Sequence, residues 1–149
     1  MQTYIASYMQ FQRRMKQNGL RITSVRKSLF QILYNADKPL TIKQLCSAIE
    51  DSHFVSIYRS VEALQKAKIV KPVSQGFTRM FELGEFFRPH HHHLSCETCG
   101  TSVELQDPML EKFISGISAR NGYRLTKHQF ELIGICFNCE TSNNRYIPK

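Results

Sequence analysis

Two pairs of closely spaced cysteines stand in the last third of the chain and have the spacing of zinc knuckles. Each pair has two residues between its members: Cys96 and Cys99, then Cys136 and Cys139. Thiolates at this spacing bind zinc tetrahedrally, and four of them complete the coordination of one structural ion. A redox CxxC is the main alternative, because either pair alone resembles one. Taken together, the two pairs favour a structural Zn(II) site.

Four consecutive histidines, residues 90–93, stand just before the first cysteine pair. Imidazole nitrogens bind divalent transition metals, including zinc and iron. If this run is extended, successive side chains point to opposite sides, so the first and third face one way and the second and fourth the other. Each pair then needs further ligands, for which the candidates are Glu82, Glu111 and His128. A solvated polar linker is the main alternative, and an expression tag is expected at a terminus instead.

The composition is that of a globular chain without a membrane span. Its 149 residues are 42% hydrophobic and 21% charged, and no apolar run approaches the roughly 20 residues that a span requires. The first eight residues lack the basic and apolar segments of a secretory signal. We therefore expect a cytoplasmic protein, and in that reducing compartment the cysteines are metal ligands rather than disulfides. The fifth cysteine, Cys46, is expected to be a small buried apolar residue.

Charge divides the chain into two halves. Residues 1–89 contain 14 Lys and Arg against 6 Asp and Glu, whereas residues 90–149 contain 6 of each. A basic half of this kind is typical of nucleic-acid binding, because Lys and Arg displace counterions from phosphates. Anionic membranes and acidic proteins attract the same surface, so charge alone does not choose between these partners.

Helical periodicity in the basic half predicts a helix-turn-helix. Apolar residues recur at helical spacing within residues 5–15, 24–33, 42–49 and 55–64. Thr41 is placed to cap the third of these helices. In the last helix Tyr58 and Arg59 are expected to face outward near its start, where recognition helices contact the DNA groove.

An alternating pattern follows the last of these helices and predicts a two-stranded hairpin over residues 69–73 and 77–83, with Gly76 in its turn. The last three of these helices followed by a hairpin form a winged helix-turn-helix, and Arg79 is a candidate phosphate contact on the wing. Such domains also occur as protein-binding modules, so the fold alone does not establish DNA binding.

The neutral half is expected to be a small α/β domain, which makes the whole chain α+β. Strands are predicted at residues 102–105, 123–125 and 129–135, and Pro108 opens a helix that ends at Asn121. A helix folded on a small sheet can bring together two cysteine pairs that have 36 residues between them.

Several motifs occur in an order that resembles the ferric uptake regulator (Fur) family of bacterial metal-dependent repressors. They are Gly19–Thr23, Ser56–Arg59, Phe81–Leu83, the histidine run, Cys96–Gly100, Leu125–His128 and the final cysteine pair. The resemblance covers essentially the whole chain. It implies a homodimer that binds double-stranded operator DNA and no small organic substrate. It also implies a DNA-binding domain at 1–83, a hinge at 84–89 and a dimerisation and metal-binding domain at 90–149.

The resemblance assigns roles to individual residues. The structural zinc ligands are Cys96, Cys99, Cys136 and Cys139. A sensory site is formed by Glu82, His91 and His93, and a further site by His90, His92, Glu111 and His128. The DNA contacts are Arg21, Tyr58 and Arg59, with Arg21 near the minor groove.

One departure from the family pattern bears on the sensed metal. Iron-sensing relatives usually carry a histidine where this chain has Pro39, so the sensory site lacks one expected ligand. Fe(II) and Zn(II) both accept His and Glu ligands, with Mn(II) as a third candidate, and the sequence leaves iron and zinc balanced. The alternatives to a repressor are a zinc-stapled protein-interaction module and a zinc enzyme with Glu111 as general base.

Overall fold

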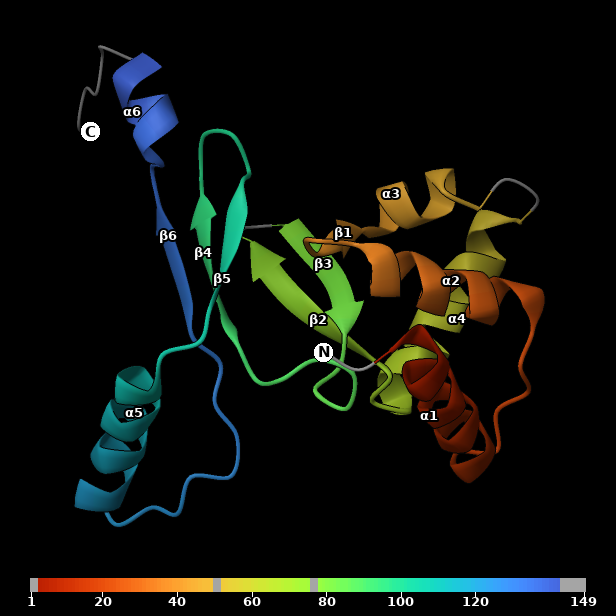
Figure 1. The fold of residues 1–149 in the computed structure, drawn as a ribbon, viewed down its shortest axis with the longest axis horizontal. Coiled ribbons are helices and arrows are strands. Elements are labelled where there is room, and N and C mark those ends of the chain that lie inside the picture. The colour runs from red at the N-terminus through yellow and green to blue at the C-terminus, as the bar shows by residue number, and fades with distance from the viewer. Residues whose placement is uncertain (1–2, 50–51, 76–77, 143–149) are drawn as a thin grey trace. The chain divides into compact units, whose positions relative to one another are not determined.

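The computed structural model describes residues 3–49, 52–75 and 78–142 (Figure 1). The chain divides into two compact units, Met1–Pro89 and His90–Lys149, which we call the N-terminal and C-terminal units. Each unit contains helices and a three-stranded sheet. The α+β class predicted from the sequence is therefore confirmed.

Four helices build most of the N-terminal unit, and three of them begin at a threonine cap. They are α1 (Tyr4–Gln17), α2 (Ser24–Asn35), α3 (Ile42–Ser47) and α4 (Phe54–Lys66). At α3 the amide of Gln44 donates to the Thr41 hydroxyl at 3.2 Å, and the Thr41 amide donates to the Gln44 side chain at 2.8 Å. This reciprocal capping box satisfies two amides that the first helical turn leaves unpaired. The cap predicted at Thr41 is confirmed.

The core of the N-terminal unit joins an aromatic cluster to an aliphatic one. Phe11 of α1 stacks on Phe30 of α2 with ring centroids 4.6 Å apart. Aliphatic side chains from α2, α3 and α4 continue this core, each at most 2% exposed: Leu29, Leu33, Leu45, Ile57, Val61 and Leu64. Because α4 gives one face to this core, its opposite face is left for solvent or a partner.

The wing is a twisted antiparallel sheet with strand order β1-β3-β2. Strands β2 (Val70–Gln75) and β3 (Thr78–Leu83) form the predicted hairpin, while Gly76 in its turn lies outside the described residues. The short strand β1 (Leu40–Thr41) was not predicted, and it pairs with β3 through Leu40 and Phe81. Two residues are too few to produce a readable alternation.

Residues 84–89, predicted as a hinge, pack within the N-terminal unit. Phe87 is 9% exposed and lies edge-on to Phe30, with ring centroids 5.2 Å apart. Arg14 donates to the carbonyl of Ala67 at 2.8 Å, and its guanidinium lies 3.7 Å from the centre of the Phe86 ring. Gly84 closely approaches the backbone of Lys68 and Ile69, just before β2, and its amide donates to the carbonyl of Ile69 at 2.9 Å. This segment is thus anchored to α1, to α2 and to the connection between α4 and β2.

In the C-terminal unit, a central strand is flanked by one antiparallel and one parallel neighbour. The sheet order is β5 (Ser102–Leu105), β4 (His92–Cys96) and β6 (Glu131–Gly134), with helices α5 (Pro108–Arg120) and α6 (Phe137–Ser142). The strand predicted at 123–125 is wrong. Gly122 leaves α5 at a φ of +78°, and residues 123–130 run as an irregular connection, because no strand among the described residues pairs with them. Helix α6 was not predicted.

Candidate metal centres and nucleic-acid interface

The four cysteines converge at one end of the C-terminal sheet. Parallel pairing of β4 with β6 sets Cys96 opposite Gly134, two residues before Cys136. The Cys136 amide donates to Cys96 Sγ at 3.3 Å, and Cys99 Sγ lies 3.7 Å from Cys136 Sγ. All four sulfurs lie within 4.8 Å of one another. Tetrahedral zinc with Zn–S bonds of roughly 2.3 Å requires sulfurs about 3.8 Å apart, so the donor set fits that ion.

The protonation chemistry of this cluster also favours a cation. Backbone amides of Cys136 and Cys99 lower the pKa of the Cys96 thiol to about 6. The Thr101 side chain and amide lower the pKa of Cys99. By contrast, hydrogen bonds from the Cys139 thiol to the sulfurs of Cys136 and Cys99 favour its protonated form and raise its pKa to about 12. A bound cation would displace this proton and take its place between the sulfurs.

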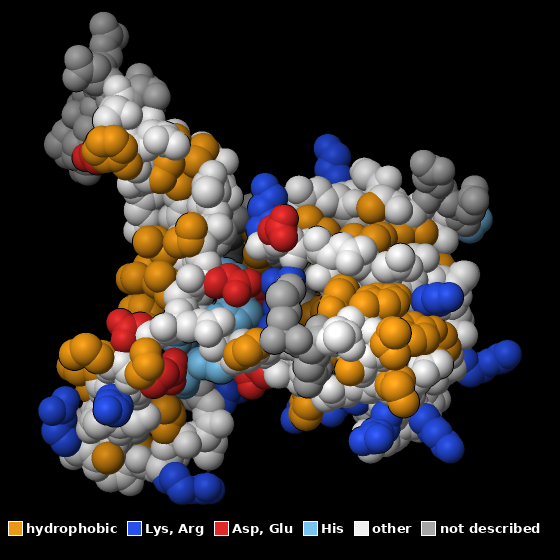
Figure 2. All heavy atoms as spheres, in the orientation of Figure 1, with side chains coloured by type: hydrophobic (Ala, Val, Ile, Leu, Met, Phe, Trp, Pro, Cys, Tyr) orange, Lys and Arg blue, Asp and Glu red, His pale blue; other side chains and the backbone are white. Residues whose placement is uncertain are grey.

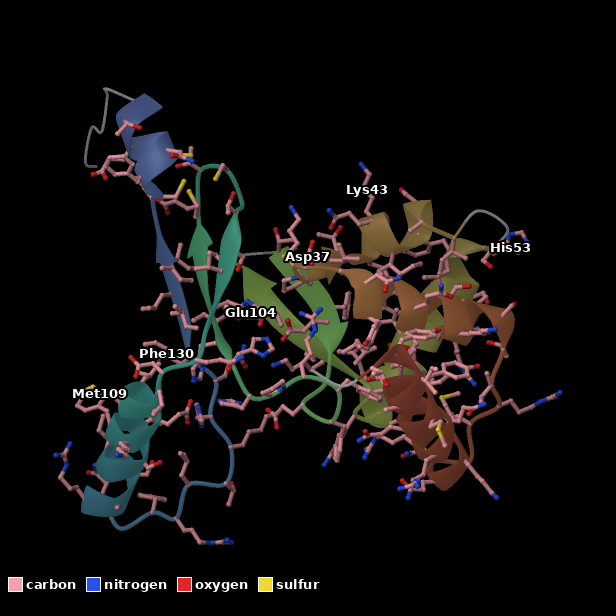
Figure 3. The ribbon with its side chains drawn as sticks, viewed as in Figure 1. Asp37, Lys43, His53, Glu104, Met109 and Phe130 are labelled. Atoms are coloured by element: carbon pink, nitrogen blue, oxygen red, sulfur yellow. The ribbon has the colours of Figure 1, made fainter. Side chains whose placement is uncertain are left out.

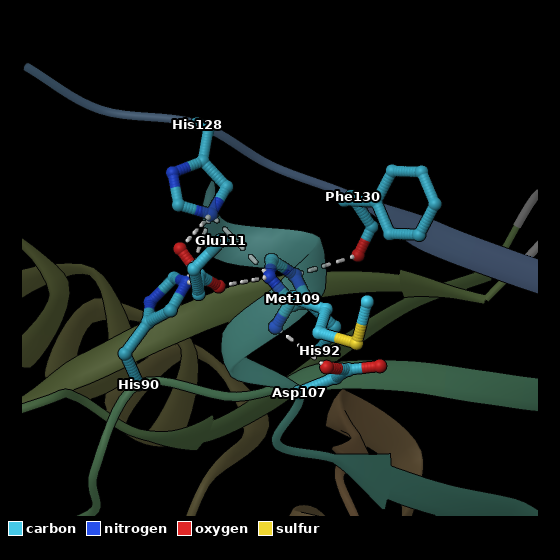
Figure 4. Close-up of polar contacts among 7 residues, drawn as sticks. All are labelled: His90, His92, Asp107, Met109, Glu111, His128 and Phe130. Carbon is cyan, nitrogen blue, oxygen red and sulfur yellow. Dashed lines mark hydrogen bonds and ion pairs between the residues drawn. The ribbon is translucent and has the colours of Figure 1, made fainter. Parts of the chain in front are cut away.

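The second cluster consists of three imidazoles and one carboxylate around a common point (Figure 4). His92 Nε2 lies 2.8 Å from Glu111 Oε1, and His90 Nε2 lies 3.0 Å from His128 Nε2. His128 Nε2 is 3.3 Å from His92 Nε2. Tetrahedral zinc with bonds of roughly 2.05 Å requires donors about 3.3 Å apart. These four side chains therefore have the spacing of a metal site.

The tautomer of His92 suits this role. Its Nδ1 lies 3.1 Å from the carbonyl oxygen of Phe130, and an N–H at Nδ1 donates to that oxygen (Figure 4). Nε2 then faces Glu111, where a proton on Nε2 donates to the carboxylate and a bound metal ion would take the place of that proton. A backbone carbonyl that orients a ligating imidazole in this way is a common second contact in metal sites. Hydrogen bonding to His92 is also the largest cause of the lowered pKa of Glu111.

The other two histidines of the run form a separate pair, which includes His91 just before β4 and His93 within it. The rings of His91 and His93 are 4.9 Å apart, whereas the ring of His92 lies 4.8 Å from that of His90. The predicted alternation is thus confirmed. The third residue assigned to the sensory site, Glu82, lies on β3 of the N-terminal unit, where it forms an ion pair with Lys71 at 2.9 Å.

Sequence reasoning missed Glu104, which lies beside this histidine pair. Strand β5 sets Glu104 opposite His93, and Glu104 Oε1 is 3.9 Å from His91 Nε2. Figure 3 labels it on β5. The strand containing Glu104 was predicted, but its register against β4 was not. The expected sensory site lacks one ligand, because Pro39 stands where iron-sensing relatives usually carry a histidine. The carboxylate of Glu104 is a candidate for that ligand.

The residues assigned to DNA contact are exposed on the N-terminal unit. Tyr58 is 43% exposed on α4, and Arg59, Arg21 and Arg79 are also exposed. Arg79 extends over the Phe81 ring at 5.5 Å. Sequence reasoning missed Phe54, which is 58% exposed in the first turn of α4. The sequence pattern that could have indicated Phe54 is an aromatic residue one helical turn before Tyr58.

None of the helices in the described part of the chain is both long and apolar enough to cross a membrane.

A winged helix-turn-helix joined to a unit with two clusters of metal-binding side chains defines a metal-binding transcription regulator. A sequence profile of the Ferric uptake regulator family matches residues 17–133. The ferric uptake regulation protein of Campylobacter jejuni is 30% identical over 136 residues, which cover 87% of this chain and 85% of that protein. The chain therefore belongs to the ferric uptake regulator family, whose members are metal-responsive transcriptional regulators rather than enzymes.

Solved structures show the same fold. The ferric uptake regulator of Helicobacter pylori, described as having three functional metal binding sites, superposes with a TM-score of 0.83 at 22% identity. That match covers 96% of this chain and 97% of the other. A zinc uptake regulator complexed with zinc and DNA superposes with a TM-score of 0.63 at 19% identity, covering 95% of this chain and 98% of that one.

Proposed function

We propose that this chain is a homodimeric repressor of metal-uptake genes that binds operator DNA when a regulatory metal is bound. The observation that carries this proposal is the division of four consecutive histidines between two sides of the segment that leads into β4. His92 is directed toward the His/Glu cluster with Glu111, and His91 lies with His93 on the other side. One short segment can thus serve one metal site inside the C-terminal unit and a second site that involves the wing.

The sensory site in this proposal consists of Glu82, His91 and His93, with Glu104 as a fourth ligand. Glu82 lies near the end of β3, and the segment 84–89 after it packs on its own unit. Only the connection from Pro89 to His90 then remains to act as the hinge. Glu82 from the wing and the two histidines from the C-terminal unit would hold one ion jointly and so restrict the motion of this hinge.

The metals follow from the donor atoms. Four thiolates favour a permanently bound structural Zn(II), whereas mixed imidazole and carboxylate donors accept Fe(II), Zn(II) or Mn(II) with easier exchange. The structural relatives support this assignment, since the Helicobacter pylori regulator has three functional metal sites and the zinc uptake regulator was solved with zinc. A bound metal ion would offset the negative charge of the thiolate and carboxylate ligands. It would also replace the protons for which neighbouring ligand atoms compete.

The partner of the C-terminal unit is a second copy of the chain. Among the described residues of this unit, the buried apolar core contains only Cys96, and no residue of α5 is buried. Apolar side chains instead lie on the surface of this unit (Figure 2). Those at least 50% exposed are Val103, Met109, Phe113, Tyr123, Ile133 and Phe137. An apolar surface of this extent is typical of an obligate homodimer interface.

DNA binding falls to the N-terminal unit. Its residues contain 14 Lys and Arg against 6 Asp and Glu, which favours a polyanionic partner. In this proposal Tyr58 and Arg59 reach base edges from α4, Arg79 contacts phosphate from the wing, and Arg21 lies near the minor groove. The zinc uptake regulator complexed with DNA has the same fold and supports this arrangement.

Metal binding would raise operator affinity through the dimer geometry. Two recognition helices must match half-sites separated by one helical turn or a multiple of it. Apo protein with a free hinge populates the matching separation only in part, and its apparent affinity is reduced by that fraction. When Glu82 and the histidines share an ion, the competent geometry is selected and transcription of metal-uptake genes is repressed.

The test is a titration of operator affinity with Fe(II), Zn(II) and Mn(II) after exchangeable metal has been removed and the cysteine-bound zinc retained. We expect the wild-type protein to bind DNA tightly only after metal is added back. Glu82→Ala should lose this response, whereas Glu85→Ala, a matched change three residues away in an exposed position, should keep it. Metal-independent binding by the wild type, or a full response by Glu82→Ala, would refute the proposed clamp.

A further inference from the structure

The first two turns of α4 expose apolar side chains that do not contribute to the core of the N-terminal unit. Phe54, Val55 and Tyr58 are 58%, 56% and 43% exposed, respectively. The opposite face of the same helix packs in the core, since Ile57 and Leu64 are 0% exposed. Phe54 therefore contributes little to folding, and exposing its ring to water is costly without a partner.

The two aromatic rings on this surface form one ridge. Phe54 and Tyr58 are one helical turn apart, and their rings stack with centroids 6.2 Å apart and planes inclined by 26°. Residues four apart lie above one another on a helix, so stacking of this kind holds both rings in place. The ridge is thus a preformed apolar edge along the start of the recognition helix.

The surroundings of the ridge suit a polyanion. Helix α4 has no acidic residue in its first turn, and its N-terminal end presents the positive end of the helix dipole. Figure 3 shows His53, the residue before Phe54, on the surface where α4 begins. The positive charge of the chain is concentrated in this unit, at 14 basic against 6 acidic residues. An apolar ridge on the unit that carries the net positive charge of the chain fits the major groove better than it fits a lipid or a hydrophobic protein groove.

We propose that Phe54 is a specificity-determining residue that contacts thymine methyl groups in the major groove, with Tyr58 contacting a second base pair. This inference rests on the DNA-binding function proposed above. In the major groove the C5-methyl of thymine is the one apolar group on a base edge, and aromatic and aliphatic side chains read it by contact. Phe54 has no polar atom on its side chain, so a methyl group is the only base feature it can distinguish.

The ridge geometry makes the proposal specific. Successive base pairs are about 3.4 Å apart along the duplex, so two steps span about 6.8 Å, close to the 6.2 Å between the rings. The thymines that depend on Phe54 and on Tyr58 should therefore lie within about two base-pair steps of each other in each half-site. Burial of one methyl group contributes about 0.8 kcal/mol, or roughly a 4-fold change in affinity.

The experiment replaces single thymines by deoxyuridine, which removes only the methyl group. The probe is a duplex that the full-length, Mn(II)-loaded wild-type protein selects from random-sequence DNA. We expect deoxyuridine at one position of a half-site to weaken wild-type binding about 4-fold. For Phe54→Ala the same replacement should have no effect, because the contact has already been lost. Phe54→Leu should keep part of the discrimination.

The control is Met9→Ala, which removes an apolar side chain that is 63% exposed on α1. This variant should discriminate thymine from deoxyuridine as the wild type does. If the wild-type protein selects a duplex but every deoxyuridine replacement affects wild type and Phe54→Ala equally, the inference about Phe54 is wrong and DNA binding stands. If metal-loaded wild type enriches no duplex at all, the proposed DNA-binding function fails, and the inference fails with it.

Discussion

His92 and Glu111 are 19 residues apart in sequence, and their side chains meet at 2.8 Å between Nε2 and Oε1. The contact joins the start of β4 to the first turn of α5 and is the largest cause of the lowered pKa of Glu111. His128 and His90 lower it further through their charges. This carboxylate thus stays ionised and able to bind metal below the usual pH range of glutamate.

The first prediction concerns this pKa in protein without metal at the cluster. His92→Ala should raise the Glu111 pKa toward its ordinary value, and His90→Ala should raise it less, because His92 is the leading cause. A lowered carboxyl pKa stabilises the folded state above the unfolded pKa, and this contribution is lost as pH falls through the folded value. Carbon-detected NMR titration of the Glu111 carboxyl measures the shift. A larger effect of His90→Ala than of His92→Ala would contradict the assignment.

The second prediction concerns the cysteine cluster. Cys99→Ser should reduce the zinc content by one ion per chain and unfold the C-terminal unit, because structural zinc contributes on the order of 10 kcal/mol of apparent folding free energy in small zinc domains. Zinc analysis and thermal unfolding measure both effects. The matched control is Cys46→Ser in the N-terminal unit, where burial raises the pKa of the thiol. Its zinc content should not change, and a loss of zinc in this control would count against the four-cysteine site.

A third prediction distinguishes a direct phosphate contact by Arg79 from the general effect of removing one positive charge. Arg79→Ala on the wing should weaken operator binding about equally for all DNA sequences. It should also reduce the slope of log affinity against log salt concentration by about 1, because one phosphate contact is lost. Binding measured across a salt series gives this slope. Arg13→Ala removes the same charge from an exposed position on α1 and should leave the slope nearly unchanged. Equal slopes for the two variants would remove Arg79 from the interface.

The fourth prediction concerns the close approach at Gly84. A Cβ atom there would lie 2.6 Å from the carbonyl oxygen of Lys68, and the backbone would have to shift. Gly84→Ala should therefore destabilise the N-terminal unit by about 1–3 kcal/mol, the usual cost of overpacking. At Gly116 on α5 no atom of the described residues outside its own helix backbone and chain neighbours lies within 4 Å of the position a Cβ would take, so Gly116→Ala should be neutral or stabilising by up to roughly 1 kcal/mol. Chemical denaturation of both variants provides the comparison.

Local patterns were sufficient to predict most elements of the fold. The apolar spacing of the four N-terminal helices, the capping residue Thr41 and the alternation in the wing each depend on neighbours within a few positions. The cysteine spacing and the histidine alternation are equally local. By contrast, the strand predicted at 123–125 failed, because a strand exists only where another strand is available for pairing.

The sequence by itself determined which side chains are able to bind metal and which faces of the helices are apolar. Only the tertiary structure decided the register that sets Glu104 opposite His93 and the packing of residues 84–89 on their own unit. It also decided that the rings of Phe54 and Tyr58 stack on the surface. The physical reason is range: periodicity and capping act within one or two turns, whereas strand register and long-range packing depend on the energy of many contacts between distant segments.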